Sequence, residues 1–297
     1  MVAGKTTKEG NHHSEENHQH RSSGLSFSRT AVGLSILIFF YCSAFPVFSQ
    51  ELKPVKNEAF TRGEKLKFRV YYDSYVTGKV SAGIATLEVN HVVKQVDGRN
   101  VYHIIGEGHS KGAFNWFFKV VDRFESFVDE EFLFPWSFIR RTQEGDYTYN
   151  DDVKFNQFSG TVLSTRTNKK IPTGTQDVLS AFYFARTFDL SDINPGQNIP
   201  IPFYLDDSLY ISQIQYVGKE EVITDLGRFR CLRFKPMVAT GNVFSQPYPM
   251  DLWVTDDKNH LPVLAKSAVI VGSVKLELIS YSGLASPLNS LLPSKEE

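Results

Sequence analysis

The sequence predicts a mainly β protein, with one strongly curved or barrel-like antiparallel sheet packed around one central helix at about residues 175–189. From residue 65 onward, most segments alternate apolar and polar residues, which is typical of strands with one buried face. Residues 175–190 are the exception, because their apolar positions cover most of a helix circumference and indicate an enclosed helix. The chain has no run of βα units, which argues against a doubly wound sheet or a TIM barrel.

The first 49 residues are expected to be a disordered leader followed by a signal peptide. A polar stretch over 1–30 precedes the apolar run Ala31–Cys42, which matches a signal-peptide core and is shorter than the roughly 20 residues that span a bilayer. Cleavage is predicted before Gln50. If the apolar run extends through Phe48, the alternative is an uncleaved inner-membrane anchor. Both interpretations predict export, to the periplasm or the outer envelope.

A single β-rich domain is expected over residues 50–284, and its first half consists of strands. Asp97-Gly98 predicts a tight hairpin between two of them. Residues 110–129 fit a strand or a helix at their start and a strand at their end. The expected strands are 66–72, 80–91, 92–96, 101–105, 121–128, 132–141, 146–155 and 160–167.

The helix over 175–189 has predicted ends and one charged residue. Thr173 with Gln176 fits a capping box, and Thr175 is an alternative N-cap. Asn194-Pro195-Gly196 ends any helical continuation. Arg186 lies on an otherwise apolar helix, so its guanidinium requires a partner. The two interpretations are a structural ion pair and recognition of an anionic ligand.

Strands return after the helix. Prolines in Ile199–Pro202 confine that segment to a sheet edge. A disordered tail is expected over 285–297. The expected strands are 210–218, 219–224, 229–236, 250–255, 262–270 and 274–282.

Several of these segments resemble a known family. They are Gln176–Ala181 with Tyr183 and Arg186, Met250–Asp257, Leu261–Val263, Gly63–Leu66 with Ala82-Gly83, and Asp122–Ser126. Together they resemble the bacterial family of unknown function numbered 3108, over about residues 60–282. The resemblance implies an exported envelope protein of mainly antiparallel β structure. The family has no established activity, so the resemblance supplies no catalytic residues.

Composition excludes several classes of function. The formal charge of −1 gives no basic excess for binding nucleic acid.

The cysteines are Cys42, in the export segment, and Cys231, which alternates within a strand and is expected to be a small core residue. His103, Glu107 and His109 share one strand face but give no third ligand at metal-binding distance. We therefore expect no metal and no cofactor.

One pattern points to hydrolysis. Gly108-His109-Ser110-Lys111-Gly112 matches the nucleophile-elbow pattern, and His260 is the one histidine that follows Ser110. That motif requires a parallel α/β sheet, which the pattern of this chain does not predict. An acyl hydrolase that uses Ser110 and His260 is therefore kept only as an alternative, and the protein is expected to be non-enzymatic.

Ten aromatic residues fall between residues 114 and 138, more than one face of a sheet accommodates. They indicate either two packed layers or an apolar cavity for an acyl chain. The leading hypothesis is a binder or carrier of a hydrophobic, lipid-like ligand, and the alternative is a scaffold or assembly factor for another envelope protein. The candidate ligand-binding residues are Phe114, Trp116, Phe118, Phe124, Trp136, Tyr183, Arg186 and Trp253.

Overall fold

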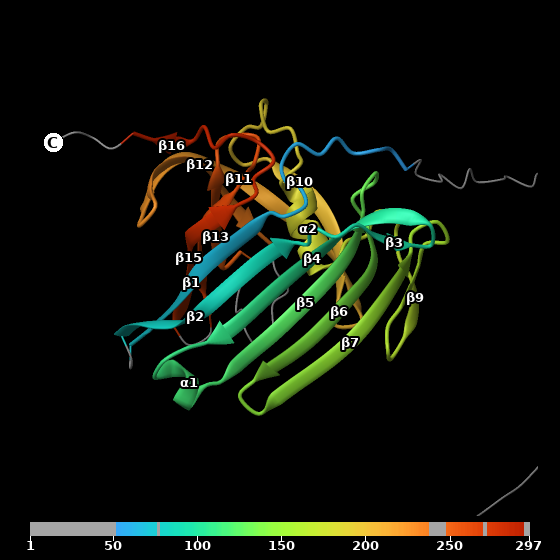
Figure 1. Ribbon diagram of the computed structural model, residues 1–297, viewed down its shortest axis with the longest axis horizontal. Helices are drawn as coiled ribbons and strands as arrows, with labels where there is room; N and C mark the ends of the chain where they lie inside the picture. The colour runs from blue at the N-terminus through green and yellow to red at the C-terminus, as the bar shows by residue number, and fades with distance from the viewer. Residues whose placement is uncertain (1–51, 76–77, 238–247, 270–271, 294–297) are drawn as a thin grey trace, which may run out of the picture. The chain divides into compact units, whose positions relative to one another are not determined.

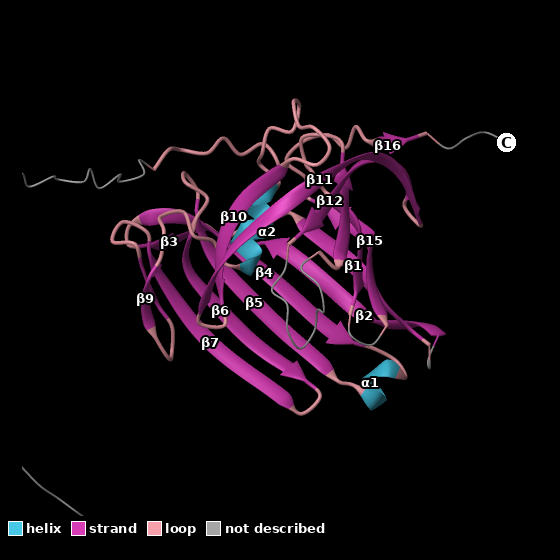
Figure 2. Cartoon of the chain, turned by 180° about the vertical axis from the view of Figure 1, so that it is seen from behind, coloured by secondary structure: helices cyan, strands magenta, loops and turns pink. Residues whose placement is uncertain are grey.

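The computed structural model describes residues 52–75, 78–237, 248–269 and 272–293. The predicted leader, signal peptide, cleavage site and Cys42 lie outside these residues. The described residues form a mainly β structure (Figures 1 and 2). Its helices are α1 (Phe114–Phe117) and α2 (Val178–Ala185).

The strands alternate with short turns along the chain. They are β1 (Lys65–Ser74), β2 (Gly78–Val89), β3 (Lys94–Val96), β4 (Arg99–Ser110), β5 (Val120–Asp129), β6 (Pro135–Glu144), β7 (Tyr147–Asn156), β8 (Thr161–Leu163), β9 (Asn168–Lys170), β10 (Asn198–Leu205), β11 (Ser208–Thr224), β12 (Gly227–Pro236), β13 (Met250–Thr255), β14 (Pro262–Ala268), β15 (Ser273–Ser282) and β16 (Leu291–Leu292).

These sixteen described strands make one antiparallel sheet, as the alternating pattern predicts. Its order is β10-β11-β12-β13-β14-β15-β1-β2-β4-β5-β6-β7-β8-β9, with β16 added on β12 and β3 on β4. The predicted hairpin at Asp97-Gly98 joins β3 to β4, with positive φ at both residues. The sheet is not closed, because its path ends at β10 and β9 without a pairing between them. A closed barrel is therefore not formed.

Helix α2 is shorter than predicted. It covers eight residues rather than 175–189, and buries Leu179, Ser180 and Tyr183. It contacts β10 at one edge of the sheet, and β4 and β5 much farther along the strand order. The opposite views of Figures 1 and 2 show it between these two parts of the sheet. The sheet therefore curls enough to place strands on two sides of α2.

The capping predicted at Thr173 or Thr175 is wrong, because residue 176 is still extended. The N–H of Gln176 donates to Pro202 O (2.9 Å) and its carbonyl accepts from the N–H of Tyr204 (2.8 Å), which pairs it with β10. The N-cap is Asp177. Its carboxylate accepts from the N–H groups of Leu179 and Ser180, and the Ser180 hydroxyl completes the capping box.

Two further expectations about the chain need correction. Residues 210–218 and 219–224 form one strand, β11, whose register shifts between Tyr216 and Gly218. The tail expected to be disordered from 285 is paired as far as residue 292, because β16 adds to β12 and the Ser290 N–H donates to Asp257. Residues 294–297 lie outside the described ranges.

Candidate ligand cavity

The start of α2 is fixed to the middle of the sheet by a buried carboxylate. The Ser126 hydroxyl of β5 donates to Asp177 Oδ2 at 2.5 Å, and both side chains are inaccessible to solvent. Burial raises the pKa of Asp177 to about 6, against the lowering effect of its hydrogen bonds to Ser126, Ser180 and Leu179. Because Gln176 pairs with β10, the residues at this end of the helix link β10 to β5.

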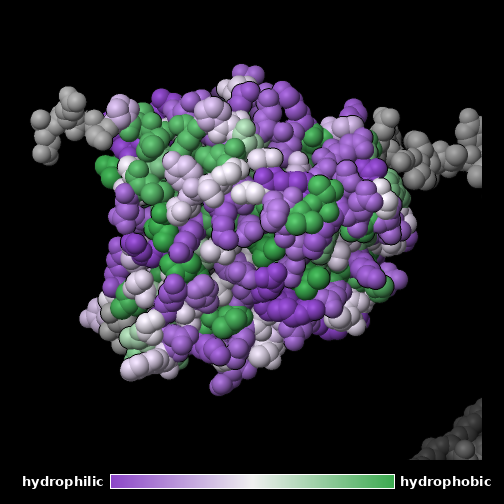
Figure 3. Space-filling model, in the orientation of Figure 1, coloured by the Kyte–Doolittle hydropathy of each residue, from purple (hydrophilic) through white to green (hydrophobic). Residues whose placement is uncertain are grey.

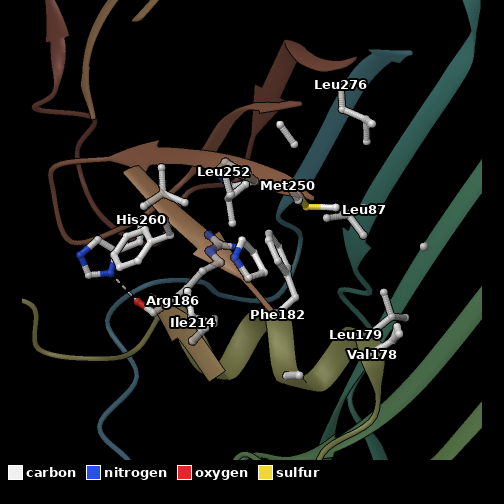
Figure 4. A pocket seen from close by; sticks show the side chains of 18 of the residues that line it. Leu87, Val178, Leu179, Phe182, Arg186, Ile214, Met250, Leu252, His260 and Leu276 are labelled. Carbon is white, nitrogen blue, oxygen red and sulfur yellow. Dashed lines mark hydrogen bonds between the residues drawn. The ribbon is translucent and has the colours of Figure 1, made fainter. Parts of the chain in front are cut away.

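The other end of α2 is fixed by Arg186. Its Nη1 and Nη2 donate to the two oxygens of Glu64, each at 2.7 Å, and further donations reach Ala59 O (3.0 Å) and Asn259 O (3.1 Å). His260 Nδ1 lies 2.7 Å from the Arg186 carbonyl oxygen (Figure 4). Of the two sequence interpretations of Arg186, the geometry supports the structural ion pair, because protein groups already occupy its guanidinium.

Between α2 and the sheet lies a cavity of about 590 Å³, which falls within the range of ligand pockets. The helix contributes Val178, Ala181, Phe182 and Ala185 to its wall, and the strands face them with mainly aliphatic side chains (Figure 4). The strand residues labelled in Figure 4 that line the cavity are Leu87, Ile214, Met250, Leu252 and Leu276. The lining therefore comes from segments far apart in the sequence.

Small residues leave this space open. Gly106 and Gly108 lie on the same face of β4, and both line the cavity. A Cβ at Gly106 would lie 3.1 Å from Leu179 Cδ2, whereas a Cβ at Gly108 would have Asp122 Cβ, 4.0 Å away, as its nearest neighbour. A glycine inside a strand marks close approach or missing side-chain volume. The alternating glycines were thus the sequence feature that could have indicated the cavity, and the prediction did not use them.

One carboxylate lines the cavity without an ion pair among the described residues. Asp122 of β5 is half-buried, and the N–H of Gln143 donates to its Oδ1 at 3.3 Å. Burial, with the nearby charge of Glu144, raises the pKa of Asp122 to about 6. The cavity wall is therefore mainly apolar, and Asp122 is a carboxylate in it whose charge changes near pH 6.

Two of the eight predicted ligand-binding residues, Phe124 and Arg186, line this cavity. Trp253 does not, since its strand neighbours Leu252 and Val254 face the cavity and its own ring packs on the other side of β13, where Nε1 donates to Glu220 (2.7 Å). Tyr183 is fully buried and packs edge-on against Phe60.

The remaining predicted residues lie away from the cavity lining. Trp136 packs with Phe134 in a separate cluster, and its Nε1 donates to Asp129 at 3.0 Å. Phe114 and Trp116 belong to α1, and Phe118 follows it, beyond the ends of β4 and β5. The aromatic residues between 114 and 138 therefore lie in three places: the segment between β4 and β5, a packed cluster and the cavity wall.

The structure does not assemble the hydrolase pair. Ser110 Oγ donates to Asn115 Oδ1 at 2.5 Å and accepts from the N–H of Val120 at 2.9 Å. His260 lies in the β13–β14 connection and its Nδ1 pairs with the Arg186 carbonyl. Ser110 also lies on an antiparallel strand rather than in a strand-to-helix elbow. The hydrogen bonds of Ser110 and His260 therefore do not support a hydrolase that uses this pair.

Within the described ranges, no group of three or more His, Cys, Asp and Glu side chains is placed to hold a metal ion. In the same residues, no helix combines the length and apolar character needed to cross a bilayer.

The fold and cavity define a class of protein: a single antiparallel β sheet that curls over a short helix and leaves an apolar cavity beside it. The chain belongs to the DUF3108 family, described as a protein of unknown function, whose model matches residues 67–279. Among curated proteins, none matches the sequence.

Solved structures of low sequence identity align with most of the chain. A β-barrel-like protein of the domain of unknown function DUF1849 from Brucella abortus has 9% identity and a TM-score of 0.47, over 78% of this chain and 99% of that one. A predicted lipoprotein from Parabacteroides distasonis has 10% identity and a TM-score of 0.34, over 78% and 100%. A predicted exported protein with a YmcC-like fold from Bacteroides fragilis has 11% identity and a TM-score of 0.30, over 77% and 99%.

Proposed function

We propose that this protein is an exported, non-enzymatic envelope protein that binds or carries a hydrophobic, lipid-like small molecule in the cavity beside α2. The observation that carries the proposal is the cavity of about 590 Å³, whose wall is mainly aliphatic and aromatic. Burial of apolar ligand surface contributes about 25 cal/mol per Å², so such a wall favours an acyl chain or a similar apolar body over a polar metabolite.

Two charged residues that line the cavity, Arg186 and Asp122, indicate which ligand head groups it favours. Arg186 lines the cavity, but its guanidinium is bound to Glu64 and to two carbonyl oxygens. It therefore offers little to an anionic head group. Asp122 instead presents a carboxylate, which accepts a hydrogen bond from a ligand hydroxyl, amide or ammonium group. The favoured ligand is thus apolar with a neutral or cationic head rather than a free fatty acid.

The alternative hypothesis is a scaffold that binds another envelope protein, which predicts a filled interior and a contiguous apolar patch on the surface. The described residues surround a cavity instead. On the face shown in Figure 3, hydrophobic residues are dispersed among hydrophilic ones. The cavity is the observation that favours the binder.

A cavity-filling variant tests the proposal. Gly108→Leu places a side chain in the open space at Gly108 and should lower the affinity for N-phenyl-1-naphthylamine, a neutral apolar fluorophore, at least tenfold. The matched control is His109→Leu, which adds an apolar side chain at the exposed neighbouring position of the same strand. Equal affinities of both variants and the wild type would contradict a ligand site in the cavity.

A second measurement uses the native ligand. Purified protein is extracted with organic solvent and the extract is analysed by mass spectrometry. A lipid that co-purifies with wild type and His109→Leu but not with Gly108→Leu, and that raises the melting temperature when added back, would support the proposal. Absence of both a co-purifying lipid and a lipid-induced rise in melting temperature would count against it.

A further inference from the structure

The three most exposed aromatic side chains of the described residues, those of Tyr75, Trp116 and Phe117, lie near one end of the sheet. Trp116 and Phe117 of α1 are 88% and 86% exposed, and Tyr75, at the end of β1, is fully exposed. Tyr147, where β7 begins, is half exposed. We call these four residues the aromatic tip. Trp and Phe seldom remain exposed without a partner, so the tip is a candidate docking surface.

The residues that flank Trp116 and Phe117 contact β1, which precedes Tyr75, and the turn that precedes Tyr147. The Phe114 ring lies 5.7 Å from the ring of Tyr72, three residues before Tyr75 on β1. A Cβ at Gly145, in the turn before Tyr147, would lie 3.1 Å from the Phe118 ring. The N–H of Gly145 also donates to Lys119 O at 2.7 Å. The residues that flank α1 thus contact β1 on one side and the β6–β7 turn on the other, and Figure 1 shows α1 beyond the end of β4.

The segment that carries Trp116 and Phe117 is held in place rather than free. Ser110 Oγ donates to Asn115 and accepts from the Val120 N–H, which joins the two strand ends across the segment. Phe114 packs against Tyr72, Phe118 lies beside Gly145, and the two phenylalanine rings contact each other edge-on at 6.4 Å. Trp116 and Phe117 are therefore presented outward by a preorganised turn, and little conformational entropy is lost when they are buried by a partner.

The charge of this segment indicates the partner. Between Ser110 and Val120 the chain has two exposed lysines, Lys111 and Lys119, and no acidic residue, whereas the β6–β7 turn beside Tyr147 has the exposed Asp146. An exposed Trp-Phe pair flanked by lysines matches the chemistry of a membrane interface, where aromatic rings occupy the head-group level and lysines lie near anionic head groups. We infer that the aromatic tip docks on the surface of a phospholipid bilayer that contains anionic lipids.

The position of the tip relates docking to the cavity. Gly108 and Asp122, which line the cavity, are each two residues from the segment between Ser110 and Val120, about 7 Å along a strand. A bilayer that contacts the tip would therefore lie close to the Asp122 end of the cavity. The inference itself depends only on the exposed aromatic residues and lysines, so it stands or fails independently of ligand binding.

Tryptophan quenching tests the docking with the full-length chain. Vesicles of phosphatidylcholine and phosphatidylglycerol with brominated acyl chains should quench the fluorescence of the wild type, and the quenching should fall at least fivefold in Trp116→Phe. Residues 1–50 have no tryptophan. The apolar run at 31–42 therefore contributes no tryptophan fluorescence of its own. Quenching that is absent, or unchanged in Trp116→Phe, would overturn the inference.

Matched variants separate docking on lipid from association between copies of the protein. Lys111→Gln/Lys119→Gln should reduce the quenching with mixed vesicles and change it little with pure phosphatidylcholine. Ile211→Ala/Ile223→Ala, which removes two exposed apolar side chains on β11, should behave as the wild type. A blue shift of Trp116 emission that grows with protein concentration in the absence of vesicles would overturn the inference, because a second copy would then cover the tip.

Discussion

Arg186 and Glu64 form a bidentate ion pair across 122 residues of sequence, with 2.7 Å at both contacts and almost no exposure of either side chain. Burial disfavours a charged guanidinium, but the negative charge of Glu64 outweighs it and the pKa of Arg186 is raised. Burial and the same negative charge raise the pKa of Tyr183 well above its usual range. The pair therefore joins the end of α2 to the segment before β1.

Removing one partner of this pair should be strongly destabilising. Arg186→Met leaves the Glu64 carboxylate buried without compensation, so the free energy of unfolding in urea should fall by about 3–5 kcal/mol. The double variant Arg186→Met/Glu64→Leu removes both charges and should recover most of that loss. If Arg186→Met lowers the free energy of unfolding by less than about 1 kcal/mol, Arg186 does not balance a buried charge on Glu64.

Asp122 should make stability depend on pH. Its pKa is about 6 in the folded protein and near 3.8 in the unfolded chain, so the folded state holds the proton more tightly. Stability should therefore rise as pH falls through 6 towards 4, and be lost as pH rises through the same window. The contribution of Asp122 is about 1–2 kcal/mol, less than the full shift implies, because solvent reaches part of the carboxylate.

The variant Asp122→Asn isolates that contribution. When urea unfolding is measured at several pH values between about 4 and 7, the free energy of unfolding of the variant should change less with pH than that of the wild type. The pKa of Asp177 is also raised to about 6, so Asp177 should contribute equally in both proteins to the change of the free energy of unfolding with pH. The affinity for N-phenyl-1-naphthylamine should increase in the wild type as pH falls and be nearly constant in Asp122→Asn. An unchanged stability profile in the variant would contradict the assignment to Asp122.

The stability of the β10–β11 turn should depend more on Asp207 than on Asp206. Both have positive φ, 49° and 57° in chain order, as a tight hairpin requires. Asp207 accepts from the Ser164 hydroxyl (2.5 Å) and from Arg166 Nε (2.6 Å), whereas Asp206 pairs with Arg140 at 2.5 Å and is half exposed.

Asp207→Ala should therefore cost about 1–3 kcal/mol in urea unfolding, because it removes these partners and retains an unfavourable φ. Asp206→Gly should change stability by less than about 1 kcal/mol, since glycine relieves the positive φ as the exposed ion pair is lost. The reverse order of effects would show that the turn is stabilised differently.

Cys231 should be unreactive until the protein unfolds. It is 1% exposed, and burial raises the pKa of its thiol to about 12. At pH 8 only about one thiol in ten thousand is then ionised. In a Cys42→Ser background, labelling by Ellman's reagent should be at least a hundredfold slower than that of a free thiol, and its rate should follow urea unfolding. Rapid labelling in the native protein would contradict the core position that the sequence predicts.

The sequence predicted most of the strands because period-two alternation arises from a local rule: a strand with one buried face needs apolar residues on that face alone. The same rule placed Cys231 in the core, and the need for a charge partner anticipated the ion pair of Arg186. Helix α2 was located, but its start was placed too early, because the pairing of Gln176 with β10 is a tertiary contact that no local capping pattern reports.

Only the tertiary structure decided where the cavity lies, that the sheet stays open, and which aromatic residues line a wall rather than fill a core. Phe124 faces the cavity while Trp136 packs in another cluster and Trp116 extends from the strand ends. The sequence by itself determined the β architecture, since alternation and turns act between near neighbours. The cavity is lined by residues that come from strands as far apart in the chain as β1 and β15. Only the curl of the whole sheet sets the distances between these strands.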